Sequence, residues 1–156
     1  MRVGGEQQNK NGQYPSTPIS LYRGSLHFYN SAKTIFSSNR TVHYDVFGFL
    51  LSHSLELVLK SFLLNKGLTE KLIIKNLGHS LVKSWEKSSL LGLGIDSKAP
   101  VWCETLNSAH DSPYHFRYAK VNTGIVLPPA QKALVDLKSI LMLVESDLKV
   151  NGENHA

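Results

Sequence analysis

The sequence contains a single cysteine, Cys103, among its 156 residues. No disulfide can therefore form within the chain, which fits a protein of a reducing compartment, so we expect a cytoplasmic protein. The first residues carry no apolar segment of the kind found in a secretory signal peptide. These absences argue against the class of small secreted domains that depend on disulfides.

The chain also lacks an uninterrupted hydrophobic run of membrane-spanning length. Its most apolar stretch, residues 46–64, is interrupted by polar and charged residues, namely Ser52, His53, Ser54, Glu56 and Lys60. A bilayer-spanning helix needs about 20 mostly apolar residues with few charges. We therefore interpret this stretch as a core helix and expect no membrane partner.

Clusters of one charge are missing as well. The net charge is +5 and the sequence pI is about 9.3, which favours acidic partners such as nucleic acid. A dedicated nucleic-acid binder usually also gathers its lysines and arginines on one face. Here the basic residues are spread along the chain, so the charge alone does not define a binding surface.

The composition divides the chain into a tail, a domain and a short end. Residues 1–18 are polar with almost no apolar side chains, so we expect a disordered N-terminal tail. By length and by an ordinary hydrophobic content, 42% for the whole chain, residues 19–150 are expected to form a single domain. Residues 151–156 are expected to be a flexible C-terminus.

Apolar residues recur at spacings of three and four along most of this domain, and no strand pair is evident. The spacing predicts an all-α fold, an up-and-down bundle of four to five main helices. Leu72, Ile73, Ile74 and Val101 are among the side chains predicted to face inward. The predicted helices cover residues 20–38, 42–66, 69–76, 80–90, 97–111 and 128–149, with an irregular segment over 112–127.

Three segments of the chain, taken in order, carry a resemblance to a known family. The first is residues 52–64 followed by Lys66 and Gly67, the second is residues 78–81, and the third is residues 116–118 followed by Gly124 and Pro128. In order and spacing they resemble the HEPN family (higher eukaryotes and prokaryotes nucleotide-binding) over residues 20–148. The resemblance implies a helical bundle, homodimerisation, and roles in RNA cleavage, nucleotide binding or inhibition of a partner protein.

Catalytic HEPN proteins carry an arginine, four to six residues and then a histidine on a late helix, and two chains pair these motifs at a dimer cleft. In this sequence the late arginine is Arg117, and no histidine follows it within that window. Arg23 with His27, and Arg40 with His43, lie too early and too close together. The resemblance therefore implies a branch without this ribonuclease motif. Many family members act in bacterial stress and defence, where a nucleotidyltransferase would be a fitting partner protein.

Polar residues in the most apolar helix are the first candidates for a site. His53, Glu56 and Lys60 are spaced three and four residues apart, so they share one helix face. They can form a polar pocket for a phosphate or a base, or a structural ion pair with a neighbouring imidazole, since a buried charge requires a partner in either case. His79 follows Gly78 at a helix start, where it either joins this pocket or caps the helix.

The irregular segment before the last helix is the second candidate. Arg117 can grip a phosphate through two parallel hydrogen bonds, and Tyr114, His115 and Tyr118 can stack on bases, as in proteins that bind single strands. Arg117 can equally serve as a structural clamp on Glu56 or on a helix end.

Two further groups are weaker candidates. Cys103, His110, Asp111 and His115 do not have the paired spacing of a closed zinc site, so we expect neither a metal nor a cofactor. Arg23 and His27 stand one turn apart, which suits general-acid chemistry but is also common on solvated helix faces.

These observations favour a HEPN-like module that binds RNA, a nucleotide or a partner protein without chemistry of its own. Whether it is an enzyme stays open, and the sequence leans against it. One alternative is a divergent, toxin-like endoribonuclease that needs no metal and uses Arg23 with His27, or His53 with Arg117. The other is a purely structural interaction subunit.

Overall fold

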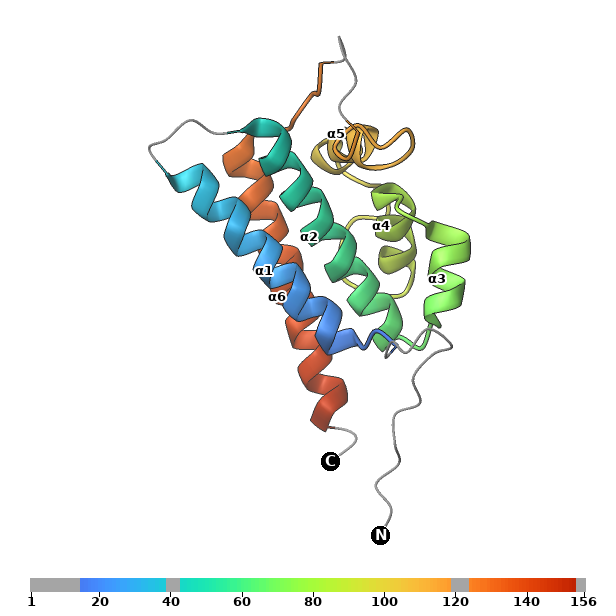
Figure 1. Cartoon of the computed structure of the whole chain (residues 1–156). Coiled ribbons are helices and arrows are strands. Elements are labelled where there is room, and N and C mark those ends of the chain that lie inside the picture. Colours follow the sequence, from blue (N-terminus) through green and yellow to red (C-terminus); the bar gives the residue numbers. More distant parts are fainter. Residues whose placement is uncertain (1–14, 39–42, 119–123, 154–156) are drawn as a thin grey trace.

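The computed structural model describes residues 15–38, 43–118 and 124–153, and in this part the chain contains six helices and no strand (Figure 1). The prediction of an all-α fold is therefore confirmed. The helices are α1 (Pro18–Ser37), α2 (Tyr44–Asn65), α3 (Glu70–Leu77), α4 (Leu81–Leu90), α5 (Val101–His110) and α6 (Ala130–Glu153).

α2 is the central helix and contacts each of the other five. The long helices α1 and α6 lie along one flank of α2, and the short helices α3, α4 and α5 lie along the other (Figure 1). Buried apolar side chains from all six helices form one continuous core. α2 is long and apolar enough to cross a membrane by composition alone, but 67% of its most apolar stretch is buried inside the bundle. This is the burial of a core helix.

α1 begins where its capping residues require. Thr17 Oγ1 accepts a hydrogen bond from the Ser20 backbone N–H, and Ser20 Oγ accepts one from the Thr17 backbone N–H. Pro18 occupies the first turn, where its missing N–H breaks no helical hydrogen bond. Residues 1–14, where the tail is expected, lie outside the described residues, and Pro18 already belongs to the helix. At the other end, α6 continues to Glu153, four residues beyond the predicted end at 149.

The inward face of two short helices was partly predicted wrongly. In α3 only Ile73 is buried, whereas Leu72 and Ile74 are 47% and 62% exposed, because α3 makes its main contact with α2 along a single edge. In α5 the first residue, Val101, is 76% exposed. That helix instead buries the face that ends at Ala109 and His110.

Candidate functional site

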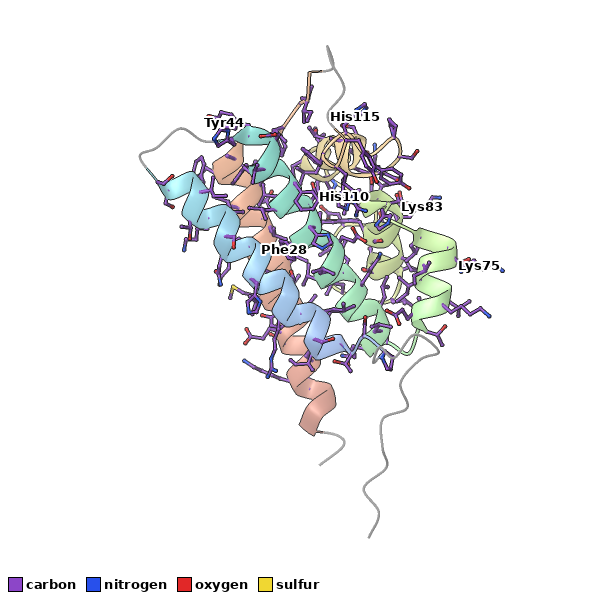
Figure 2. All side chains as sticks on the ribbon, in the orientation of Figure 1. Phe28, Tyr44, Lys75, Lys83, His110 and His115 are labelled. Atoms are coloured by element: carbon purple, nitrogen blue, oxygen red, sulfur yellow. The ribbon has the colours of Figure 1, made fainter. Side chains whose placement is uncertain are left out.

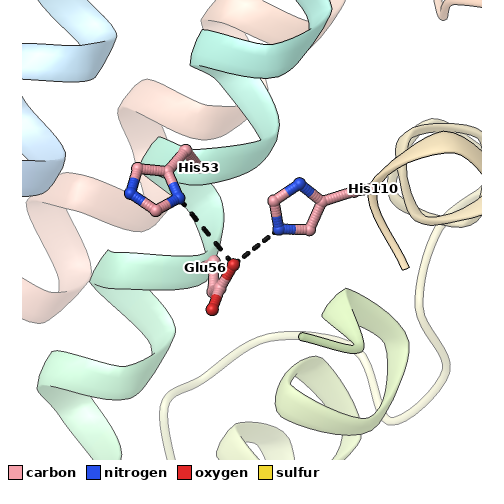
Figure 3. Close-up of side chains that lie close together, drawn as sticks. All are labelled: His53, Glu56 and His110. Carbon is pink, nitrogen blue, oxygen red and sulfur yellow. Dashed lines mark hydrogen bonds and ion pairs between the residues drawn. The ribbon is translucent and has the colours of Figure 1, made fainter. Parts of the chain in front are cut away.

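The polar cluster of this protein is centred on Glu56, whose side chain is 4% exposed in the middle of α2. Its two carboxylate oxygens have different partners. Oε1 accepts from Lys60 Nζ at 2.6 Å and lies 3.0 Å from His79 Nδ1. Oε2 lies 2.5 Å from His110 Nε2 and 3.9 Å from His53 Nδ1 (Figure 3). We call these five residues the Glu56 cluster.

Three stretches of chain build the Glu56 cluster. α2 contributes His53, Glu56 and Lys60 from one face, as the spacing predicted. His79 sits in the turn between α3 and α4, where Gly78 takes a positive φ of 55° that favours glycine. His110 ends α5 and lies between α2 and the short helices (Figure 2). Ser80, the next residue along from His79, caps α4 by accepting from the Lys83 backbone N–H.

The electrostatics of the cluster favour an ionised carboxylate. Burial acts to raise the pKa of Glu56, but the hydrogen bond from His110 and the charge of Lys60 outweigh it and hold the pKa well below its usual range. For His53, burial lowers the pKa, and the attraction of Glu56 offsets this only in part. The ring of His53 packs edge-on against Phe28 and stacks on Phe49, so one side of the cluster is aromatic.

Arg117 and Tyr114 extend the cluster toward the surface. Tyr114 has a positive φ of 60°, and its ring meets His79 edge to face with centroids 5.9 Å apart. The Arg117 guanidinium lies 5.8 Å from the centre of the Tyr114 ring. Lys60, Glu56, His79, Tyr114 and Arg117 therefore form a chain of neighbouring side chains, which we call the polar row.

A small pocket of about 260 Å³ opens beside Arg117 at the start of α2, lined by Asp45, Val46, Phe49, Phe116 and Arg117. Next to the pocket, α2 carries Gly48. A Cβ at this position would lie 2.7 Å from the Phe116 ring and 2.5 Å from Leu127, so a larger residue would require these side chains to shift.

Larger hollows lie elsewhere, but they contain fewer side chains suited to catalysis or ligand binding. One of about 480 Å³ runs between α1 and α6 beside Tyr29 and Lys138, and another of about 580 Å³ lies beside Trp85, Trp102 and Asp136. The first is lined by Tyr29, Lys33 and Lys138 and the second by Asp96, Lys132 and Asp136, but neither lining includes a histidine or a buried carboxylate. We therefore place the candidate site at the Glu56 cluster and its neighbouring pocket.

Most of the residues predicted from the sequence come together. His53, Glu56, Lys60 and His79 share the cluster, and Tyr114 and Arg117 adjoin it through His79. In the described part of the chain Arg117 makes no ion pair with Glu56, so that clamp is absent. The side chain of Tyr118 is 64% exposed, and only its backbone N–H is recorded against this group, donating to the Tyr114 carbonyl at 3.1 Å.

The sequence analysis missed His110 as a member of the site. Of Cys103, His110, Asp111 and His115, only His110 reaches the cluster, while Cys103 is buried in the apolar core with its pKa raised to about 12 by burial. His110 stands four residues after Leu106 on the buried face of α5, a spacing that could have identified it. Arg23 and His27 are both exposed on α1.

Comparison of the chain with protein-family models, with curated proteins and with solved structures found no match.

Proposed function

We propose that this chain is a HEPN-like helical bundle that binds RNA or a nucleotide at the polar row and the adjacent pocket, without chemistry of its own. The observation that carries the proposal is the polar row next to an aromatic pocket. Lys60, His79 and Arg117 offer donors for phosphate oxygens, and Tyr114 offers a stacking face.

The pocket at the start of α2 supports a base as the second half of the ligand. Its walls are the rings of Phe49 and Phe116, and Arg117 and Asp45 are its charged members. At about 260 Å³ it is smaller than the pockets of about 300 Å³ or more that take drug-sized ligands. This size suits a single ring system, and stacking on aromatic side chains contributes about 1–3 kcal/mol per base.

The test is fluorescence anisotropy with a short labelled single-stranded RNA. We expect saturable binding that weakens steeply with salt, because phosphate contacts release counterions. Arg117→Ala and Tyr114→Ala should each weaken binding about tenfold, which corresponds to about 1.4 kcal/mol. The matched control is Lys149→Ala, which also removes one exposed cation. It lies near the end of α6 far from α5 (Figure 1), so affinity should hardly change. Equal losses of RNA affinity in all three variants would show that binding is not specific to the polar row.

A second candidate function is a metal-independent endoribonuclease, and the pairing of His79 with Glu56 favours it. His79 is two-fifths exposed while its Nδ1 is held 3.0 Å from a buried carboxylate, the arrangement of a histidine that exchanges protons with a substrate. An RNA cleavage assay in the presence of a chelator decides between the binding module and the endoribonuclease. Labelled RNA is incubated with the wild-type protein and with three variants, His79→Ala, His53→Ala and His27→Ala. Cleavage lost in one variant establishes the enzyme, and binding without cleavage supports the non-catalytic module.

We propose further that the protein acts as a cytoplasmic homodimer in bacterial stress or defence, with a nucleotidyltransferase as a fitting partner protein. The outer face of α6 supports an interface, since Val135, Met142 and Leu143 are 55%, 58% and 39% exposed. Light scattering during size-exclusion chromatography should give twice the chain mass. Met142→Glu should shift the protein to a monomer, and a monomeric wild type would contradict this part of the proposal. A dimer that binds no RNA or nucleotide would favour a structural interaction subunit.

A further inference from the structure

His53, Glu56 and His110 form a group whose ligand-type atoms all lie within 4.8 Å of one another (Figure 3). His53 and Glu56 are three residues apart on α2, and His110 comes from α5. A carboxylate and an imidazole at this spacing, with a further ligand from a facing helix, is how helical bundles build metal sites in their cores. Two imidazoles with one carboxylate suit zinc and its neighbours, rather than magnesium or calcium.

The two carboxylate oxygens of Glu56 contact different residues, as is expected of a carboxylate that binds a metal through one oxygen. Oε1 is occupied by Lys60 and His79, while Oε2 faces only His53 and His110. In metal sites a coordinating carboxylate is usually oriented by hydrogen bonds from outer residues. Lys60 and His79 would hold the carboxylate through Oε1 and leave Oε2 for an ion.

An unpartnered nitrogen atom, Nδ1 of His53, lies at the same place. Nδ1 of His53 and Nδ1 of His110 are both buried without a hydrogen-bond partner, and the His110 side chain is fully buried. An unpartnered buried polar atom costs about 1–3 kcal/mol, and a bound ion is one common explanation for such an atom. A metal ion bound through His53 Nδ1 would remove that cost at His53.

We propose that His53, Glu56 and His110 bind one divalent transition-metal ion of the zinc class, with water in the remaining position. The 3.9 Å between His53 Nδ1 and Glu56 Oε2 is close to the separation of about 3.4 Å expected for two ligands on one tetrahedral zinc ion. His110 Nε2 and Glu56 Oε2, at 2.5 Å, share a hydrogen bond. Ion entry therefore breaks this hydrogen bond and moves the imidazole outward, because the ring binds a metal through Nε2 only as the neutral tautomer that carries its proton on Nδ1.

This proposal does not rest on nucleotide binding: it shares Glu56 with the polar row, but it needs no RNA. Its test is a titration of the untagged, chelator-treated full chain with Zn²⁺ against a chromophoric chelator. A parallel titration with Co²⁺ reads the visible absorption bands of a tetrahedral site. We expect one ion per chain and intense cobalt bands. His110→Gln and His53→Gln should each weaken Zn²⁺ binding by at least about 100-fold, because even loss of an outer-shell residue costs about 10–100-fold.

His27→Gln is the matched control, because it removes one exposed imidazole from α1 and should leave the affinity unchanged. Circular dichroism checks that each variant is folded. His53 is one-quarter exposed, so its substitution preserves a usable protein if His110→Gln does not fold. Absence of one-to-one binding in the folded wild type overturns the proposal. It is also overturned if His53→Gln keeps the wild-type affinity, because the ions would then sit on other surface histidines.

Discussion

The two flanks of α2 differ in the charge and the hydrogen bonding of their buried polar groups. Toward α1, Ser25 and Ser54 exchange hydrogen bonds, each hydroxyl donating to the other residue's carbonyl at 2.7 and 2.9 Å. Toward α4 and α5, the same helix buries an ionised carboxylate among a lysine and three histidines. On the first flank the buried hydroxyls are uncharged and satisfied, and the ion pair between Lys66 and Asp147 of α6 is partly exposed, so we call it the neutral flank for its buried groups. The second retains unpartnered nitrogens, so its polar groups exceed what packing requires, and function is the better explanation of them.

The largest expected effect is at the centre of the charged flank. Glu56→Ala leaves Lys60 and His110 without their acceptor, and breaking a buried ion pair in this way costs about 3–5 kcal/mol. Urea denaturation measures the free energy of unfolding. Glu104→Ala is the control, since Glu104 is 43% exposed and its lysine partner is 3.9 Å away; it should change stability by less than about 0.5 kcal/mol. A loss below 1 kcal/mol for Glu56→Ala would mean that the cluster is not electrostatically coupled.

A smaller effect is expected where the pocket meets α2. Gly48→Ala places a Cβ against Phe116 and Leu127 at 2.7 and 2.5 Å, and overpacking of this kind costs about 1–3 kcal/mol. It should also displace Phe116 and weaken RNA binding. Gly24→Ala is the control on the other flank, because its Cβ meets only the tip of Leu57 at 3.3 Å and alanine favours a helix. Equal stability of the two variants would show that Phe116 is not seated on Gly48.

The neutral flank should respond more weakly than the charged one. Ser54→Ala removes one donor to the Ser25 carbonyl and should cost about 1 kcal/mol. Ser146→Ala deletes an exposed hydroxyl that bonds only within α6 and should be nearly neutral. Thermal denaturation of the two variants checks this. A Ser54→Ala loss as large as that of Glu56→Ala would erase the proposed difference between the flanks.

The smallest effect is expected for the buried thiol. Burial raises the pKa of Cys103 to about 12, so almost no thiolate exists near pH 8 and modification by iodoacetamide should wait for unfolding. The measurement is the labelling rate by mass spectrometry, with the same protein in urea as the fully reactive control. Rapid labelling of the native protein would show that this part of the core opens.

Much of the fold follows from the sequence because helical periodicity is a local property. α1, α2 and α6 are recognisable from their apolar spacing, and α4 from polar residues at its start that can cap the first turn. Part of the site could be predicted because it also depends on local spacing. His53, Glu56 and Lys60 share a face through local spacing, whereas the contact of His110 with Glu56 spans 54 residues. Such a contact depends on how α5 packs against α2.

The pocket could not be foreseen from either segment alone. Its walls come from Phe49 on α2 and Phe116 after α5, and Phe116 lies close against Gly48 of α2. Leu72 and Ile74 show the opposite case. Their spacing is compatible with burial, but no neighbouring helix covers them.

The most direct test of the account is an amide chemical-shift map of the labelled protein with the short single-stranded RNA. If the charged flank of α2 is the functional one, shifts should concentrate at Phe49, His79, Tyr114 and Arg117 and be absent along the groove between α1 and α6. Shifts confined to that groove, around Tyr29 and Lys138, would contradict the account. No shifts at all at saturating RNA concentrations would contradict it equally.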